Sequence, residues 1–193
     1  MHRFYADDQG VTGDVAYLCE EDARHATRVL RMRQGEACEL FADGKRFSGE
    51  IASIGDGEVA VRITGEMPST EARLRITLYQ GLPKADKMEL IIQKAVELGV
   101  HAVVPVSTKR CVVKLDDKKA AKKVERWNSI SEGGAKQSGR NVIPQVKPVM
   151  SYKEAMQYAK ELDVVLIPYE LAEGMAETRQ IIEAIRPGQS VGI

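Results

Sequence analysis

Cysteine and histidine are scarce in this sequence of 193 residues, with three of each, and neither residue type is clustered. Cys19, Cys38 and Cys111 form no Cys-x-x-Cys pair, which argues against a zinc site and favours free thiols in a reducing compartment. No stretch is apolar for long enough to span a membrane, and the amino terminus lacks the apolar core of a secretion signal. We therefore expect a soluble cytoplasmic protein without a bound metal ion.

A net charge is also lacking, because 28 Lys and Arg residues balance 28 Asp and Glu residues. The distribution is uneven, however: residues 109–147 hold 11 basic and 4 acidic side chains. This basic middle favours a polyanionic partner.

No Gly-x-Gly-x-x-Gly motif follows a predicted strand, so a Rossmann-type nucleotide or methyltransferase site is not expected.

Two regions differ in their pattern. The first, residues 1–66, has short predicted strands at 15–18, 37–42, 45–54 and 58–63, with a hairpin signal at Asp43-Gly44, and this spacing predicts a small β-barrel. Residues 67–73 have no periodicity and form a predicted linker. Residues 74–193 alternate between strand and helix patterns, which predicts an α/β domain.

A helix is predicted inside the barrel region, over residues 20–32. Its spacing places Arg24, Arg28 and Arg31 on one face, with His25 beside them and Arg3 as a further cation of the same region. Each arginine taken alone is consistent with an ion pair to a nearby carboxylate. As a set of one sign they favour a phosphate backbone.

Residues 74–110 predict a strand, a helix starting at a capping box on Asp86 and ending at Gly99, and a second strand. Strands joined in this way are parallel, so their carboxyl ends share one edge of the sheet, which is where such sheets bind ligands. Four cationic residues follow the two strands, and we call this set the rim: Lys84, Lys87, Lys109 and Arg110. Lys94 extends this basic surface along the helix, and an ordinary solvated helix face is the alternative interpretation.

Further helices are predicted from residues 116–117 and from Ser151, which forms a capping-box pattern with Glu154. Gly133-Gly134 lies within the first of them and predicts close approach of another backbone, a subunit or a ligand, because glycine costs about 1 kcal/mol there relative to alanine. The polar group Gln137, Ser138 and Arg140 marks either a helix end or a binding site. The chain stops inside a strand that begins at Ser190, so we expect the domain to be incomplete at its carboxy end.

The sequence resembles the bacterial 16S ribosomal RNA uridine-N3 methyltransferases of the SPOUT superfamily over essentially its whole length. The order and spacing of several short motifs carry the resemblance: residues 1–5 (MHRFY), His25 with Val29-Leu30-Arg31, Leu82-Pro83-Lys84, Glu97-Leu98-Gly99-Val100, Thr108 with Arg110, and Gln137-Ser138-x-Arg140 with Pro144.

The resemblance implies a PUA-like RNA-binding barrel in residues 1–66 and a trefoil-knot α/β domain in residues 74–193. It further implies S-adenosylmethionine as methyl donor, a homodimer, and the small-subunit RNA of the ribosome as substrate. The Gly-Pro-Glu-Gly loop of the family is absent, so part of the cofactor site is expected after Ile193.

Site residues can be carried over from the family in part. The cofactor-binding candidates are Leu166, Ile167, Pro168 and Tyr169. Arg110 and Arg140 are the candidates for stabilising charge on the pyrimidine oxygens, and the proton acceptor is unassigned. The RNA-binding candidates are Arg3, Arg24, His25, Arg28, Arg31, Lys84, Lys87 and Lys94.

Two other functions are consistent with the sequence. A non-catalytic RNA-binding or ribosome-assembly module requires only the barrel and the basic surfaces. An enzyme acting on a small phosphorylated metabolite would explain the rim but not the barrel arginines.

Overall fold

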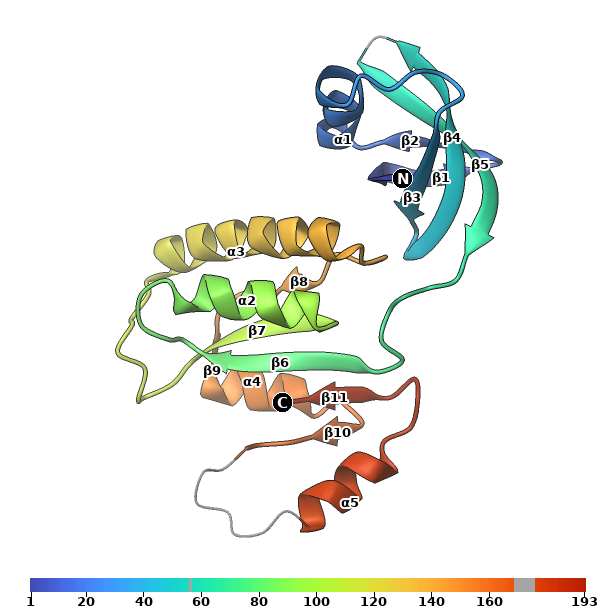
Figure 1. Cartoon of the computed structure of the whole chain (residues 1–193). Helices are drawn as coiled ribbons and strands as arrows, with labels where there is room; N and C mark the ends of the chain where they lie inside the picture. The colour runs from blue at the N-terminus through green and yellow to red at the C-terminus, as the bar shows by residue number, and fades with distance from the viewer. Residues whose placement is uncertain (56, 169–175) are drawn as a thin grey trace. The chain divides into compact units, whose positions relative to one another are not determined.

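A computed structural model describes residues 1–55, 57–168 and 176–193, which fall into two units (Figure 1). Unit 1 contains residues 1–71 and 139–142, and unit 2 contains residues 72–138 and 143–193. The boundary between Glu71 and Ala72 lies inside the predicted linker. The short segment 139–142 groups with the first unit, although it lies within the predicted second domain.

Unit 1 is a closed barrel of five strands in the order β1-β2-β5-β4-β3. Its strands are β1 (His2–Thr12), β2 (Val15–Leu18), β3 (Ala37–Ala42), β4 (Lys45–Gly55) and β5 (Glu58–Met67). Parallel pairing of β1 with β3 closes the barrel, and Phe4, Leu40 and Ile51 fill its interior. The four predicted strands are present, whereas β1 was not predicted because polar residues and a glycine interrupt its pattern.

The barrel helix is shorter than predicted and is not a single α-helix. An α-helical turn, α1 (Glu20–Arg24), continues into a π-helical segment, η1 (His25–Val29). The Leu30 N–H donates to the His25 carbonyl oxygen five residues back, and Arg31 adopts a φ of 53°. Because the wider π turn changes the angular spacing, the prediction of one α-helical arginine face is wrong. Arg24, Arg28 and Arg31 are nevertheless all exposed.

Unit 2 contains a parallel sheet in the order β10-β11-β6-β7-β8, with β9 also paired to β7. The strands are β6 (Arg75–Gly81), β7 (Ala102–Ser107), β8 (Gln145–Val146), β9 (Met150–Ser151), β10 (Val164–Val165) and β11 (Ser190–Gly192). The register of β6 with β7 runs from Thr77 opposite Ala102 to Gly81 opposite Val106. The prediction that these two strands end at the same edge is confirmed.

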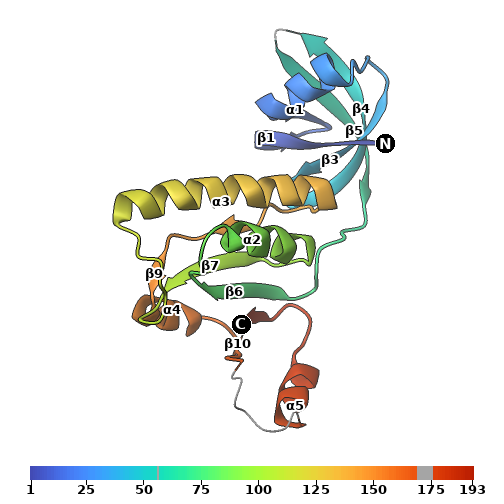
Figure 2. The same ribbon diagram turned by 60° about the vertical axis from the view of Figure 1, so that its left-hand side comes forward.

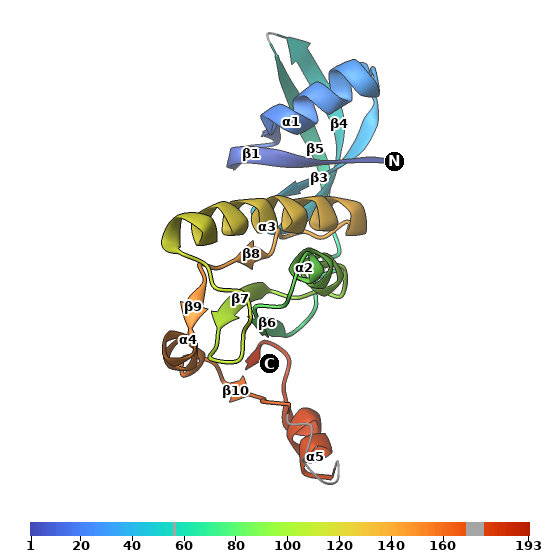
Figure 3. The ribbon, with the colours of Figure 1, turned by 90° about the vertical axis from the view of Figure 1, so that its left-hand side faces the viewer.

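Helices cover both faces of this sheet (Figures 2 and 3). On one face lie α2 (Lys87–Glu97) and α3 (Asp117–Ser138), and on the other lies α4 (Tyr152–Ala159). Val103 of β7 packs into a core with Ile92 and Trp127, while the next residue, Val104, packs with Ala155 of α4. This alternation follows the two-residue period of a strand. The last helix, α5 (Ala176–Ala184), has no buried residue.

The helix starts and the glycine pair show which local predictions hold. The predicted capping box of Ser151 with Glu154 is present. The predicted helix start at Asp86 is confirmed, since Asp86 is the N-cap residue of α2, although its side chain accepts no capping hydrogen bond. A Cβ on Gly134 would lie 3.3 Å from Cγ1 of Val96 and 3.8 Å from the backbone oxygen of Gln93, so α2 approaches α3 closely at this glycine. A Cβ on Gly133 would meet nothing within 4 Å.

Among the described helices, none has the length and apolar character needed to cross a membrane.

Candidate functional site

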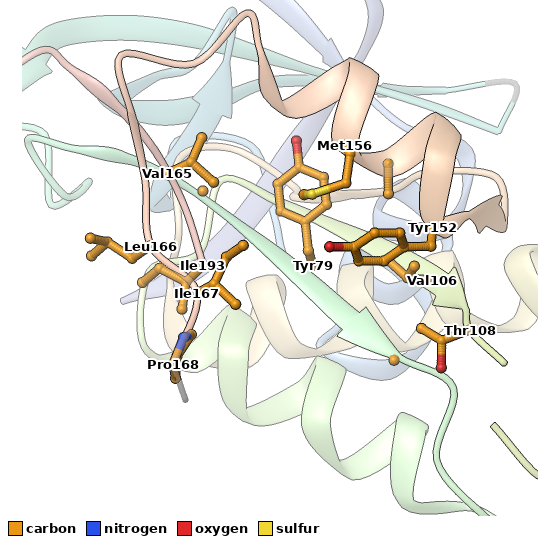
Figure 4. A pocket seen from close by; sticks show the side chains of 13 residues that line it. Tyr79, Val106, Thr108, Tyr152, Met156, Val165, Leu166, Ile167, Pro168 and Ile193 are labelled. Carbon is orange, nitrogen blue, oxygen red and sulfur yellow. The ribbon is translucent and has the colours of Figure 1, made fainter. Parts of the chain in front are cut away.

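A pocket of about 260 Å³ lies at the carboxyl edge of the parallel sheet in unit 2 (Figure 4). The ends of β6, β7, β10 and β11 and one side of α4 enclose it. Its walls are formed by Tyr79, Gly81, Val106, Thr108, Tyr152, Ala155, Met156, Val165, Leu166, Ile167, Pro168, Gly192 and Ile193. The pocket is therefore at the edge where the sequence predicted a ligand.

Backbone hydrogen bonds fix three of these strand ends. The Tyr79 N–H donates to the Ile193 carbonyl oxygen (2.7 Å), and the Leu166 N–H donates to the Gly192 carbonyl oxygen (2.8 Å). At the other end of β11, Oδ2 of Asp163 accepts from the N–H (2.7 Å) and the hydroxyl (2.6 Å) of Ser190. These hydrogen bonds from Ser190 lower the pKa of Asp163. The segment from Asp163 to Leu166 is thus anchored to β11 at both of its ends.

The chemistry of the walls fits the adenosyl part of S-adenosylmethionine. The side chains of Val106, Met156 and Ile167 are apolar, as a flat aromatic base requires, and the strand ends bring backbone groups to the edge. A Cβ on Gly192 would lie 2.8 Å from Cδ1 of Leu162 and 3.1 Å from Cε2 of Tyr79. A larger residue at position 192 would therefore displace a pocket wall.

Three of the four predicted cofactor residues line this pocket, namely Leu166, Ile167 and Pro168. The fourth, Tyr169, lies outside the described residues. The sequence reasoning did not assign Tyr79, Val106 or the α4 residues to the pocket. The rule that ligands bind where parallel strands end could have identified Val106, whereas the contribution of α4 depends on its packing across the sheet.

The rim residues Lys84, Lys87, Lys109 and Arg110 are all exposed, and within the described part of the chain none of them forms an ion pair. They follow β6 and β7, so the structure brings them to the predicted edge. Lys94 is also exposed, but it pairs with Glu97 at 2.7 Å. It lies about two helical turns from Lys87, toward the opposite edge of the sheet. The RNA contacts of Lys84, Lys87 and Lys94 stay predictions.

Arg140 lies in segment 139–142, which groups with unit 1. Its guanidinium pairs with the carboxylate of Glu71, and its side chain is only 10% exposed. Its carbonyl oxygen accepts from the hydroxyl of Tyr5 at 2.6 Å. These contacts assign Arg140 a structural role in unit 1, and its catalytic role stays a prediction.

The predicted RNA-binding residues of the barrel are exposed. Arg24 pairs with Glu20 at 3.1 Å, and Arg3 pairs with Glu39 at 3.2 Å. His25, Arg28 and Arg31 are exposed beside them. The Arg24–Glu20 pair is exposed on both sides and therefore weak, so a phosphate group can compete for Arg24, whereas the Glu39 partner of Arg3 is buried.

Metal-binding side chains do not gather in the described ranges: no group of three His, Cys, Asp or Glu residues there could hold a metal ion.

A parallel α/β sheet with an apolar pocket at its carboxyl edge, attached to a small barrel, defines a ligand-binding protein of two units. Comparison with known families is more specific. Residues 70–193 match an RNA methyltransferase domain, and residues 18–64 match an RNA methyltransferase PUA domain. The chain belongs to this family of RNA methyltransferases.

Similar proteins include the ribosomal RNA small subunit methyltransferase E of Bacillus subtilis, 36% identical over 178 residues. That alignment covers 89% of this chain and 69% of the relative. A methyltransferase from Legionella pneumophila, solved with bound SAM, has a TM-score of 0.73 and 33% identity over 98% of this chain and 77% of its own. The Neisseria gonorrhoeae ribosomal RNA small subunit methyltransferase E, bound to S-adenosyl methionine, has a TM-score of 0.72 and 32% identity over 100% of this chain and 79% of its own.

Proposed function

We propose that this protein methylates N3 of a uridine in 16S ribosomal RNA, with S-adenosylmethionine as the methyl donor. Membership of the RNA methyltransferase family and the two similar structures that hold the donor support the reaction class. The observation that carries the proposal for this chain is the apolar pocket at the carboxyl edge of the sheet. It includes the loop after β10, where the resemblance placed the cofactor.

The residues of the chain have separable tasks in this reaction. Bound S-adenosylmethionine supplies an electrophilic methyl group on a sulfonium. The apolar walls around Val106 and Met156 would shield the adenosyl group from water. Arg110 lies two residues after Thr108, a wall residue, and its guanidinium is exposed and forms no ion pair with the described residues. It is our candidate for stabilising negative charge on the pyrimidine oxygens once N3 has lost its proton.

RNA binding is assigned to two basic surfaces, one in each unit. We propose that Arg24, Arg28 and Arg31 of unit 1 contact phosphates, as do Lys84 and Lys87 of the rim. Replacing the three arginines with alanine should reduce the slope of log affinity against log salt by about 0.9 per lost contact for a duplex and about 0.7 for a single strand. Arg62→Ala is the matched control, because Arg62 is an exposed barrel arginine paired with Glu50. A slope that is unchanged in the triple variant contradicts the assignment.

The finer architecture is also a proposal. We infer that the barrel is PUA-like over its full length and that unit 2 is a SPOUT-type domain with a trefoil knot. The sheet order supports this, because β11, last in the chain, lies between β10 and β6. We further propose a homodimer, which sedimentation analysis should detect as twice the monomer mass of 21.3 kDa.

The test of the function is methyl transfer from labelled S-adenosylmethionine to small ribosomal subunits that lack the modification. We expect label in 16S RNA and 3-methyluridine after nuclease digestion. RNA binding without transfer would instead support the non-catalytic module. Label on another base would leave the enzyme class standing and overturn the assignment to N3.

A further inference from the structure

The turn that follows β7 is held together by the thiol of Cys111. Its sulfur accepts from the N–H of Thr108 at 3.4 Å and lies 3.3 Å from the Thr108 hydroxyl oxygen. The thiol also contacts the carbonyl oxygen of Val106 at 3.7 Å. The backbone closes the same turn, because the Cys111 N–H donates to the Thr108 carbonyl oxygen at 3.2 Å. One side chain therefore bonds the two strand-end residues that line the pocket.

This turn also connects the ends of two neighbouring strands. The Leu82 N–H, just after β6, donates to the same Val106 carbonyl oxygen at 3.0 Å. The Cys111 sulfur lies 4.0 Å from the position of a Cβ built on Gly81. Lys114 reaches back and donates to the Thr108 carbonyl oxygen at 3.2 Å. The ends of β6 and β7, at Gly81 and Val106, thus both lie next to the Cys111 sulfur atom.

We propose that Cys111 is a positioning residue, whose thiol holds Thr108 in the wall of the methyl-donor pocket and Arg110 at the rim. The proposal rests on the function assigned above, since it concerns the geometry of the same pocket. Arg110 immediately precedes Cys111, so the thiol contacts constrain the backbone from which the guanidinium extends. Cys111 acts through these two residues and does not itself touch the donor.

The pKa of the Cys111 thiol is consistent with the hydrogen bonds that it forms. Burial raises the pKa of Cys111, but the hydrogen bonds from Thr108 and Leu82 and the nearby charge of Lys114 outweigh it, so the pKa lies below its ordinary value. A sulfur that only filled space would raise its pKa on burial, as Cys38 does in the barrel core, to about 11. Cys111 therefore has hydrogen-bonding partners in addition to its packing against the hydrophobic core of unit 2.

The test compares three variants. Cys111→Ser keeps a donor and an acceptor, Cys111→Ala removes both, and Val112→Ala is the control, because Val112 is the next residue and is 69% exposed. The first readout is amide hydrogen exchange of residues 107–112. We expect Cys111→Ala to speed exchange at Thr108 and Cys111 by about tenfold, as the loss of one to two hydrogen bonds implies. Cys111→Ser and Val112→Ala should stay within about threefold of the unchanged protein.

The second readout separates positioning from packing. Cys111→Ala should weaken binding of S-adenosylhomocysteine and lower kcat, each by about tenfold, with KM for RNA unchanged, and Cys111→Ser should restore both. If alanine matches the unchanged protein, or if serine is as impaired as alanine, the proposal is overturned and Cys111 is only a packing residue. If the unchanged protein does not bind S-adenosylhomocysteine, the proposed function fails, and the exchange experiment still decides the role of Cys111.

Discussion

Replacing Arg140 with alanine should destabilise unit 1 strongly. Glu71 accepts hydrogen bonds from the Arg140 guanidinium and from the backbone N–H groups of Asn141 (2.7 Å) and Val142 (3.2 Å). Removing one partner of a buried ion pair costs roughly 3–5 kcal/mol. Glu71 is 19% exposed and keeps its two backbone donors in the variant. We therefore expect a loss of stability at the lower end of this range, about 3 kcal/mol.

The structure offers a matched control with the same chemistry at the surface. Arg126 also forms a two-pronged pair, with Glu89 (2.6 and 2.8 Å), but its side chain is 65% exposed. Arg126→Ala should cost much less, because ion pairs with an exposed arginine contribute little to stability. Arg140→Lys keeps the charge but loses the fork geometry, so its cost should lie between those of the two alanine variants.

The assay is thermal and urea unfolding followed by circular dichroism. For a chain of this size, about 3 kcal/mol corresponds to a fall in Tm of about 6–12 °C. Equal melting temperatures for Arg140→Ala and Arg126→Ala would refute the reasoning. A loss of methyl transfer in Arg140→Lys with little change in stability would favour the catalytic role predicted from the sequence.

Three further predictions concern other parts of the chain. Gly192→Ala should weaken binding of S-adenosylhomocysteine, measured by calorimetry, because its Cβ would displace Leu162 and the pocket-wall residue Tyr79; unchanged affinity would contradict the geometry. Gly133→Ala should stabilise α3 by up to about 1 kcal/mol in urea unfolding, since a Cβ there has open space, whereas Gly134→Ala should gain less because Val96 is 3.3 Å away; the reverse order would contradict the packing. The pKa of Asp163 is lowered by Ser190, so its contribution to stability is present above the unfolded pKa and is lost as pH falls through the folded pKa. Asp163→Asn should therefore lower Tm at neutral pH and differ less from the unchanged protein in acid, and a pH-independent difference would exclude this origin.

Features that depend on neighbouring residues in the chain were predictable. The capping box at Ser151 involves a residue three positions later, and the helix between β6 and β7 requires those strands to be parallel. The edge that carries Lys84 and Arg110 follows from that topology. The cofactor candidates Leu166 to Pro168 came from the resemblance, and the structure places them in the pocket.

Features set by distant residues were not predictable from local patterns. Glu71 and Arg140 are 69 positions apart, so a motif containing Arg140 gave no sign of its buried partner. The π-helical segment after Arg24 has the composition of an α-helix, so its residue types did not distinguish the two geometries. Strand β1 is polar at its centre and is held by pairing with β2 and β3.

The central claim is that the carboxyl edge of the parallel sheet in unit 2 binds the methyl donor. Ultraviolet cross-linking with S-adenosylmethionine labelled in the methyl group, followed by peptide mapping, tests it most directly. We predict label in peptides spanning residues 152–168 or 190–193, and its loss when S-adenosylhomocysteine competes. Competed label confined to the barrel or to α2 and α3 would contradict the account.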